Sequence, residues 1–418
     1  MERMFERCCG VDVHRDTLVA TIRSADGKRV STQSRTFVTY ADGLAELSGW
    51  LDEHGVEAVV MEATGVYFQP VVHALRRLSP HRLVLVANPL AVKQMPGRKT
   101  DVSDSAWLAK LLMNGVVSPS FIPPEQIEEL RKLSRYRAKK VAGKTATKNR
   151  IIKLAESEGI KLATVVSDVL GKSCRAMLQA LVQGGRSAEQ IAELAQGSLR
   201  NKRAELVRAL NNPVNETTLW ILGQLLDDLA QEEARIAQVE AELSRRLQAH
   251  YSREMALLQT IPGIAEHIAA TIVAETGADM SLFPSAAHLA SWGGLAPGNH
   301  QSAGKSRRVS VRAGNPWFRT ALVQAAQVLA RKRDSPFRAF FLRVLQSSAN
   351  YNKAVLAVAR KLAVTIYYVL RDGELRWPEP QVLSDSSQAR LRQQAVTQLE
   401  KLGYEVSLTK PQSGPSES

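Results

Sequence analysis

Four acidic residues in the first quarter of the chain have the types and settings that metal-dependent phosphate chemistry requires. Asp12 stands in the apolar stretch GVDV, and Glu62 ends the apolar stretch VVME. Asp101 and Asp104 lie three residues apart in RKTDVSDSAWLAKLL, so they share one face if this stretch is helical. A charge in a buried strand is costly unless it is paired or holds a cation. Asp12 is therefore the hardest of the four to explain as an ordinary surface residue.

Carboxylates gathered in this number need hard cations, and Mg²⁺ or Mn²⁺ with oxygen ligands is the natural choice. Two such ions about 4 Å apart can stabilise the attacking and leaving oxygens of a phosphodiester. Taken singly, each acid has a plainer explanation: Asp101 could cap a helix, Glu62 could cap the turn after it, and Asp104 could be a surface charge. Together, the four predict a divalent-cation site.

An α/β arrangement would bring these acids together. Apolar patterning predicts strands at 8–13, 17–23, 30–38, 57–61 and 82–87, helices at 41–54 and 69–78, and a further helix containing Asp101 and Asp104. Three consecutive strands that can form a meander, followed by crossovers, predict a mixed sheet flanked by helices. The first and fourth strands are then plausible neighbours, and a helix after the fifth strand can reach their ends.

The chain as a whole is strongly basic. Its 418 residues include 55 Lys and Arg against 41 Asp and Glu, a formal net charge of +14. This excess favours a polyanionic partner, with nucleic acid ahead of an anionic membrane. The absence of a CxxC pair argues against a zinc site, and no apolar run is long enough to span a membrane. With a charged N-terminus and no P-loop match, we expect a reduced, cytoplasmic protein that is not an ATPase.

One predicted helix, 125–156, concentrates the positive charge, because the stretch from Arg131 to Lys153 contains no acid. A run of one sign cannot satisfy itself through pairs within the helix, so it favours phosphate contact over a merely solvated face. The candidate nucleic-acid contacts on this helix are Arg131, Lys132, Arg135, Lys139, Lys140, Lys144 and Lys148.

A heptad pattern follows in the middle of the chain. Apolar residues recur at intervals of seven, at Leu222, Leu229, Ile236 and Leu243. This spacing is typical of a coiled coil. It favours pairing between two chains, and the alternative is an antiparallel pair of helices within one chain.

A candidate nucleophile lies in the C-terminal part, in a Gly-rich stretch without acids. Ser302 stands in PGNHQSAGKSRRVSVR, and no Asp or Glu occurs between Met280 and Arg333. A serine that attacks a phosphodiester generates a crowded anionic transition state, which nearby cations stabilise. The alternative is a solvated loop that only binds phosphate, with Ser306 and Ser310 as competing assignments. The cations that follow the serine are Lys305, Arg307, Arg308 and Arg312.

Several of these motifs resemble one family. GVDVHRD, VMEATGVY and RKTDVSDSAWLAKLL are similar to the insertion sequence one-ten family of transposases, which includes a pilin-gene invertase. The four acids also look like the DEDD tetrad of RuvC-like nucleases with the RNase H fold. Pro297, Ser302 and Gly304 match the family's P-x4-S-x-G pattern, and LLQTIPGIAEHIAATIVAETG is similar to a helix-hairpin-helix.

The resemblance implies a DNA transposase or recombinase of a mobile element, with Mg²⁺ or Mn²⁺ on the tetrad and Ser302 as the recombination nucleophile. It also implies homo-oligomers, as dimers whose pairs synapse two DNAs, and guidance by a structured RNA made from the element's ends. The alternatives are a metal-dependent structure-specific endonuclease, such as a junction resolvase, and a nucleic-acid-binding assembly protein with a decayed site.

The expected fold class is α/β plus all-α, in four parts. Residues 1–122 form an RNase H/RuvC-like mixed-sheet domain, and 123–250 form the basic helix and coiled coil. Residues 251–372 form a helical C-terminal transposase domain that contains the helix-hairpin-helix-like motif. Residues 373–418 form a short helix and a disordered tail.

Overall fold

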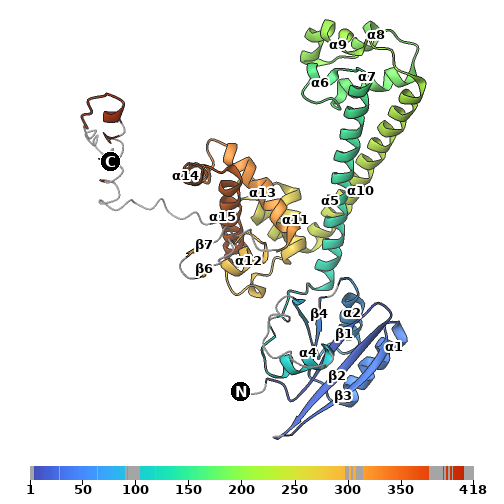
Figure 1. Cartoon of the computed structure of the whole chain (residues 1–418), viewed down its shortest axis with the longest axis vertical. Helices are drawn as coiled ribbons and strands as arrows, with labels where there is room; N and C mark the ends of the chain where they lie inside the picture. The colour runs from blue at the N-terminus through green and yellow to red at the C-terminus, as the bar shows by residue number, and fades with distance from the viewer. Residues whose placement is uncertain are drawn as a thin grey trace.

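The computed structural model describes residues 4–27, 29–63, 65–89, 92, 104–117, 119–296, 301–302, 305–306 and 314–375, with 389, 392–393, 396–397 and 399–408. Asp101, Pro297, Gly304, Arg307, Arg308 and Arg312 lie outside the described residues, as does much of the expected tail. For Ser302 and Lys305 only the backbone is described. Three bodies follow one another in space: an α/β unit, a two-helix stalk with a helical cap at its far end, and a helical C-terminal unit (Figure 1).

The α/β unit contains a five-stranded mixed sheet of order β3-β2-β1-β4-β5, as the meander and crossovers predicted. β1 is antiparallel to β2, β2 is antiparallel to β3, and β1, β4 and β5 run parallel. The strands are β1 (Arg7–Val13), β2 (Thr17–Asp26), β3 (Arg29–Val38), β4 (Ala58–Glu62) and β5 (Leu83–Ala87). The helices are α1 (Ala41–Glu53), α2 (Phe68–Leu78) and α4 (Asp104–Met113).

Helices cover both faces of this sheet, and the side chains of each central strand alternate between them. Cys9 and Val11 of β1 are buried in one cluster with residues of α1 and α2. Cys8 is buried on the opposite face, in a cluster with Trp107 and Leu108 of α4. Because neighbouring residues of a strand point to opposite faces, Gly10 and Asp12 lie on the face that α4 covers.

The stalk consists of α5 (Glu125–Ser157) and α10 (Glu216–Gln259), which pack against each other. Leu243 of α10 shares a core with Ile127 near the start of α5, whereas Leu222 shares a core with Ile151 near its end. The two helices are therefore antiparallel (Figure 1). The heptad residues do form a buried seam, but the preference for pairing between chains was wrong for this seam. It is covered by α5 of the same chain. The apolar residues of α5 stand between many charged ones, so the sequence did not identify α5 as the partner.

The cap fills the connection between the two stalk helices, at 161–210. It buries Met177, Leu178 and Leu206 against the adjoining ends of α5 and α10. Its elements are α6 (Leu162–Val165), α7 (Lys172–Gln183), α8 (Ala188–Ala192), a 3₁₀ helix (Gly197–Lys202) and α9 (Arg203–Leu210).

The C-terminal unit is helical and has its own large core, which includes Phe318, Phe337 and Ile366. The helix, Pro-Gly turn and helix expected at 257–277 are present as the end of α10, a turn, and α11 (Glu266–Thr276). The other elements are a 3₁₀ helix (Met280–Leu282), α12 (Ala286–Trp292), β6 (Gln301–Ser302), β7 (Lys305–Ser306), α13 (Pro316–Arg331), α14 (Arg338–Ser348) and α15 (Tyr351–Asp372). Within the described ranges, no helix is long and apolar enough to cross a membrane.

Candidate active site

Asp12 and Glu62 lie at the same end and on the same face of the sheet. The parallel pairing of β1 with β4 matches Val11 to Met61, so the next position along each strand carries one of the two acids. Val60 is buried in the cluster with α4, which places Glu62, two residues further on, on the α4 face together with Asp12. Neighbouring strands in a sheet are about 4.8 Å apart. This proximity was expected from the sequence, and the strand register provides it.

Helix α4 runs in the opposite direction to β1 and starts at this same end of the sheet. The Cys8 thiol donates a hydrogen bond to the Ala109 carbonyl (3.3 Å), and burial raises the pKa of that thiol to about 12. One turn earlier in α4, the Ser105 hydroxyl bonds to that of Thr21 (2.8 Å), which pairs with Gly10. The first residue of α4, Asp104, therefore lies toward the end of β1 where Asp12 stands.

Gly10 permits this close approach of α4 to the sheet. A Cβ atom at Gly10 would lie 2.0 Å from the Ser105 carbonyl oxygen and 2.4 Å from the Ala109 backbone nitrogen. Only a glycine leaves room for the helix backbone at that distance. Sequence analysis did not single out Gly10, although a glycine two residues before an acid in a buried strand is a usable signal.

The described acids do not make up a complete metal-ligand set. Asp12 is 30% exposed and its Oδ2 lies 3.3 Å from His14 Nε2, while Asp104 is exposed. Within the described part of the chain, no three His, Cys, Asp or Glu side chains are close enough to form a metal-ligand set. The donor chemistry nevertheless suits a hard divalent cation, because all the acids offer carboxylate oxygens. The fourth candidate ligand, Asp101, lies outside the described residues.

Ser302 stands in a short antiparallel ladder within the C-terminal unit. The backbone of Gln301 pairs with Ser306 and that of Ser302 with Lys305. The stretch that contains this ladder, Gly293 to Gly314, is called the serine loop here. It leaves α12 and returns at Asn315, which begins α13.

The cations of α5 have acidic partners on other helices, which sequence analysis overlooked. Arg137 binds Glu240 of α10, and Lys144 binds Glu233 of α10 at 3.0 Å. Lys132 pairs with Glu128 of its own helix at 3.5 Å. The preference for phosphate contact considered only pairs within the helix, whereas α10 packs against α5 and supplies opposite charges.

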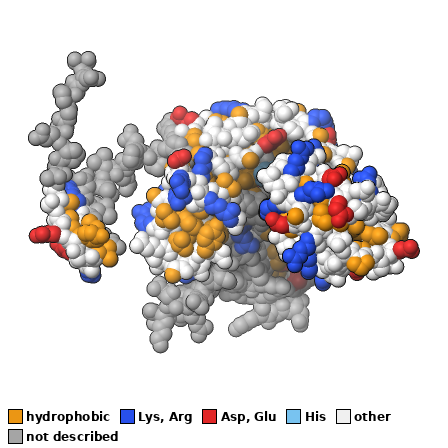
Figure 2. Space-filling model, turned by 90° about the horizontal axis from the view of Figure 1, so that it is seen from above, with side chains coloured by type: hydrophobic (Ala, Val, Ile, Leu, Met, Phe, Trp, Pro, Cys, Tyr) orange, Lys and Arg blue, Asp and Glu red, His pale blue; other side chains and the backbone are white. Residues whose placement is uncertain are grey.

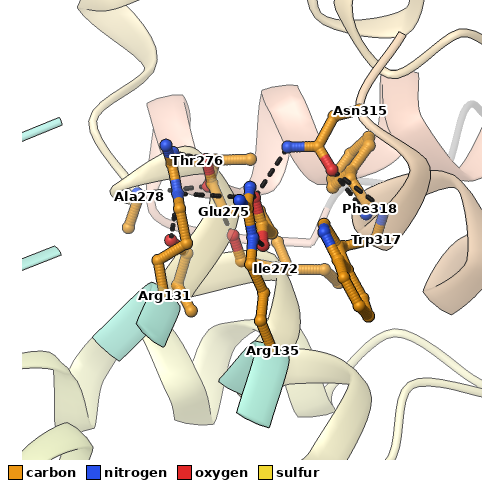
Figure 3. A network of polar contacts seen from close by, with 10 residues as sticks. Arg131, Arg135, Ile272, Glu275, Thr276, Ala278, Asn315, Trp317 and Phe318 are labelled. Atoms are coloured by element: carbon orange, nitrogen blue, oxygen red, sulfur yellow. Dashed lines mark hydrogen bonds and ion pairs between the residues drawn. The ribbon is translucent and has the colours of Figure 1, made fainter. Parts of the chain in front are cut away.

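Arg131 and Arg135 are engaged more deeply than the other α5 cations. Both bind Glu275, the fully buried acid of α11 (Figure 3). Burial lowers the pKa of Arg131, and the charge of Glu275 opposes that effect. By contrast, Lys139 and Lys148 have none of the ion pairs found among the described residues. Lys140 has no such ion pair either, but its Nζ lies over the Tyr136 ring at 5.6 Å. Lys139 and Lys148 therefore remain available to a phosphate backbone.

A cavity of about 280 Å³ separates the α/β unit from the start of α5. Ala63, the residue after Glu62, contributes to its wall, as do Phe68 and Phe121, and Lys132 and Arg135 line its α5 side. In the view from above, Lys and Arg side chains also lie around an exposed hydrophobic patch on the C-terminal unit (Figure 2). Cations thus border the acidic edge of the sheet and occur elsewhere on the surface.

Acids at the end of a mixed sheet, with cations beside them, favour an enzyme that acts on nucleic-acid phosphates. Comparison with family models narrows this class. A DEDD model described as "Transposase" matches residues 9–157, and one described as "Transposase IS116/IS110/IS902 family" matches residues 255–342. The chain belongs to the IS110 family of transposases.

Curated relatives agree with this assignment. The pilin gene-inverting protein of Moraxella bovis is 24% identical over 87% of this chain and 95% of its own length. The 43.6 kDa protein of insertion element IS110 from Streptomyces coelicolor is 26% identical over 66% of this chain and 72% of its own. The 44.8 kDa protein of insertion element IS116 from Streptomyces clavuligerus is 25% identical over 72% and 81%. The protein is accordingly an enzyme that rearranges DNA.

Proposed function

We propose that this transposase cuts and rejoins DNA through an RNase H-like acidic site that acts together with Ser302. The observation that carries the proposal is the placement of three acids. Asp12 and Glu62 end adjacent parallel strands on one face, and Asp104 begins the helix that covers that face. The strand order β3-β2-β1-β4-β5, with an antiparallel meander leading into two parallel strands, supports the RNase H-like assignment.

The acidic residues would hold the cation and orient the DNA phosphate. Asp12, Glu62 and Asp104, completed by Asp101, supply carboxylate oxygens at the sheet end, where the strand ends leave the side chains accessible. A bound Mg²⁺ or Mn²⁺ would withdraw charge from the scissile phosphate. The protein's own contribution is to fix the carboxylates against the sheet through the close contact of α4 with Gly10.

Ser302 would supply the nucleophile. Its Oγ forms a bond to phosphorus while the bond from phosphorus to one DNA oxygen breaks. The hydroxyl proton leaves Oγ, and the released DNA oxygen takes up a proton. Because one phosphodiester replaces another, the energy of the bond is kept for rejoining. The acid-free surroundings with Lys305, Arg307, Arg308 and Arg312 support this role by favouring the anionic transition state.

We further propose that the enzyme works as a homo-oligomer on DNA under the guidance of an element-encoded RNA. The family resemblance supports both features, and Lys139 and Lys148 on α5 offer cations for a phosphate backbone. Purification without nuclease, followed by sequencing of the bound nucleic acid and light scattering before and after RNase, tests both. Protein that carries no RNA and stays monomeric with DNA would contradict this part of the proposal.

Trapping of a covalent intermediate tests the central claim. A nicked duplex made from an element end is incubated with Mg²⁺, and protein–DNA adducts are resolved on a denaturing gel. We expect Ser302→Ala to abolish the adduct and Ser306→Ala to retain it. Asp104→Asn should retain DNA binding and lose the adduct. Hydrolytic cleavage by Ser302→Ala at the wild-type rate would instead identify a metal-dependent endonuclease.

A further inference from the structure

A fully buried carboxylate, Glu275, stands in the last turn of α11. Its side chain has 0% exposure, although glutamates are among the residues least often buried. A buried charge is costly unless ionic partners and hydrogen bonds surround it. Its partners therefore indicate what the buried charge does.

Two of these partners come from α5. Arg135 donates from Nε and Nη2 to the two Glu275 oxygens, both at 2.8 Å. Arg131 donates to the backbone carbonyls of Ala274 (3.3 Å) and Glu275 (2.6 Å), and so satisfies the C-terminal end of α11. The guanidinium of Arg135 also lies over the Trp317 ring at 5.8 Å, and that of Arg131 over Phe121 at 5.4 Å. Helix α5 is thus joined rigidly to the end of α11.

The third partner, Asn315, directly follows the serine loop. Asn315 Nδ2 donates to Glu275 Oε2 at 2.7 Å (Figure 3). The Asn315 Oδ1 accepts from the backbone N–H groups of Trp317 and Phe318, both at 3.0 Å, and so caps α13. One side chain therefore connects the buried carboxylate to the start of α13.

Asn315 also closes the neck of the serine loop. Its backbone N–H donates to the Trp292 carbonyl at 2.9 Å, which ties the end of the loop to its beginning. The preceding residue, Gly314, lies against Gly294, so that a Cβ at Gly314 would be 2.3 Å from the Gly294 backbone nitrogen. The position of this neck determines where the loop starts and ends.

We propose that Glu275 is a positioning residue for the DNA-joining reaction: it holds Asn315, and with it the neck of the serine loop, in fixed relation to the basic helix α5. This inference rests on the proposed role of Ser302. Glu275 itself does not touch the reacting atoms. Its charge is matched to two arginines from one element and an amide from another, so a shift of α5 changes the position of the loop neck.

The composition of the cluster favours positioning over plain stability. Replacing a buried ion cluster with apolar residues of similar volume often leaves stability unchanged or raises it. The charged cluster adds a fixed orientation. The two parallel hydrogen bonds from Arg135, together with the one from the Asn315 amide, hold the carboxylate in one orientation. Catalysis depends steeply on such orientation, since a misplacement of about 1 Å can cost 100-fold in rate.

The substitution Asn315→Asp removes the hydrogen bond from Asn315 to Glu275 but keeps the side-chain cap at the start of α13. Aspartate caps helices as well as asparagine does, so α13 keeps its start. The donor that faces Glu275, however, becomes a second carboxylate, and the tie is replaced by repulsion. Adding Glu275→Gln to this variant reverses the polarity of the pair: the glutamine amide can donate to the new aspartate. This restores a hydrogen bond between the same two positions and gives up the hydrogen bond from Arg135 Nη2.

The measurement uses the full-length protein with its co-purified nucleic acid and the nicked element-end duplex. The rate of adduct formation is measured at saturating duplex, and duplex affinity and unfolding temperature are measured in parallel. The matched control is Asn350→Asp, because Asn350 caps α15 by accepting from the Lys353 N–H at 3.0 Å, away from Glu275. A role in folding alone would lower the unfolding temperature without slowing the reaction of bound complexes.

We expect Asn315→Asp to slow adduct formation by about 10-fold to 100-fold with duplex affinity unchanged, and Asn350→Asp to react normally. The Glu275→Gln/Asn315→Asp pair should recover part of the lost rate, because one hydrogen bond from Arg135 is given up. Asn315→Ser, which keeps a capping hydroxyl too short to reach Glu275, serves where the aspartate variant fails to fold.

Two outcomes would overturn the inference: wild-type adduct rates in both single Asn315 variants, or no recovery in the pair. Failure of the proposed function looks different, because Ser302→Ala would then join DNA normally whatever the Asn315 variants do.

Discussion

The close contact between β1 and α4 makes Gly10→Ala a sharp test of the acidic site. The new Cβ would meet the Ser105 carbonyl oxygen at 2.0 Å and Leu108 Cβ at 2.9 Å. Relaxed carbon–oxygen contacts lie at about 3.3 Å or more, so α4 has to retreat by about 1.3 Å. Neither neighbouring atom is the end of a flexible side chain, and the strain falls on the helix itself. The retreat moves Asp104 away from Asp12.

Two effects follow from this displacement. Overpacking of this kind costs about 1–3 kcal/mol of stability. Misplacement of a reacting group by about 1 Å can slow catalysis 100-fold. We therefore expect Gly10→Ala to lower the unfolding temperature of the α/β unit modestly, to slow strand cleavage and joining by about 100-fold, and to raise the Mg²⁺ concentration needed for half-maximal rate.

The assay measures the cleavage and joining rate of element-end DNA over a series of Mg²⁺ concentrations, with thermal unfolding alongside. Gly49→Ala is the control, because Gly49 is exposed within α1 and a Cβ there meets nothing within 4 Å. That change should stabilise α1 by about 0.5–1 kcal/mol and leave the rate unaltered. A Gly10→Ala protein with the wild-type rate and Mg²⁺ dependence would refute the placement of the acids.

Three further predictions concern the stalk. Hydrogen bonds from Arg175 and then Lys144 hold the pKa of Glu233 at about 2, below its ordinary 4.5. The resulting stabilisation is complete above pH 4.5 and is lost as pH falls toward 2. Glu233→Gln should therefore flatten the dependence of the unfolding free energy on pH in that window, measured by chemical unfolding. Lys139→Gln and Lys148→Gln should each reduce the slope of log affinity against log salt by about 0.9 in DNA titrations, while paired Lys144 should contribute less. Leu229→Ala should destabilise the stalk by about 2–5 kcal/mol without changing the oligomeric state by light scattering, because this seam is buried within one chain; dissociation of an oligomer by that variant would restore pairing between chains.

The sequence was sufficient for features that depend on local pattern. The apolar stretches CCGVDV and EAVVM predicted buried strands and plausible neighbours, and the observed pairing places Asp12 beside Glu62. The helix expected at 125–156 is present as Glu125–Ser157. These elements were predictable because the spacing of buried apolar residues follows the geometry of the helix or strand that contains them.

Features that depend on contacts between distant segments could not be predicted in this way. Nothing near Arg135 indicates that its partner is Glu275, 140 residues later. The heptads of α10 marked a seam without identifying its partner, because α5 contributes apolar residues between its cations. Glu275 itself did give a local signal: it stands in IVAETG, an acid among apolar residues, and the reasoning applied to Asp12 would have identified it.

The two arginines that bind Glu275 also connect the two proposed halves of the chemistry. Arg131 and Arg135 line the cavity whose wall includes Ala63, the residue that follows Glu62, and on their other side they hold the carboxylate that anchors the serine-loop neck. Within one chain, α5 therefore lines a cavity that reaches the residue after Glu62, and it also binds the support of the loop. Loss of the Glu275 carboxylate would therefore free the neck without removing a cation from the exposed surface of α5. Substitutions of Glu275 should slow the reaction of bound complexes, whereas Lys139→Gln should weaken DNA affinity and leave that rate unaltered.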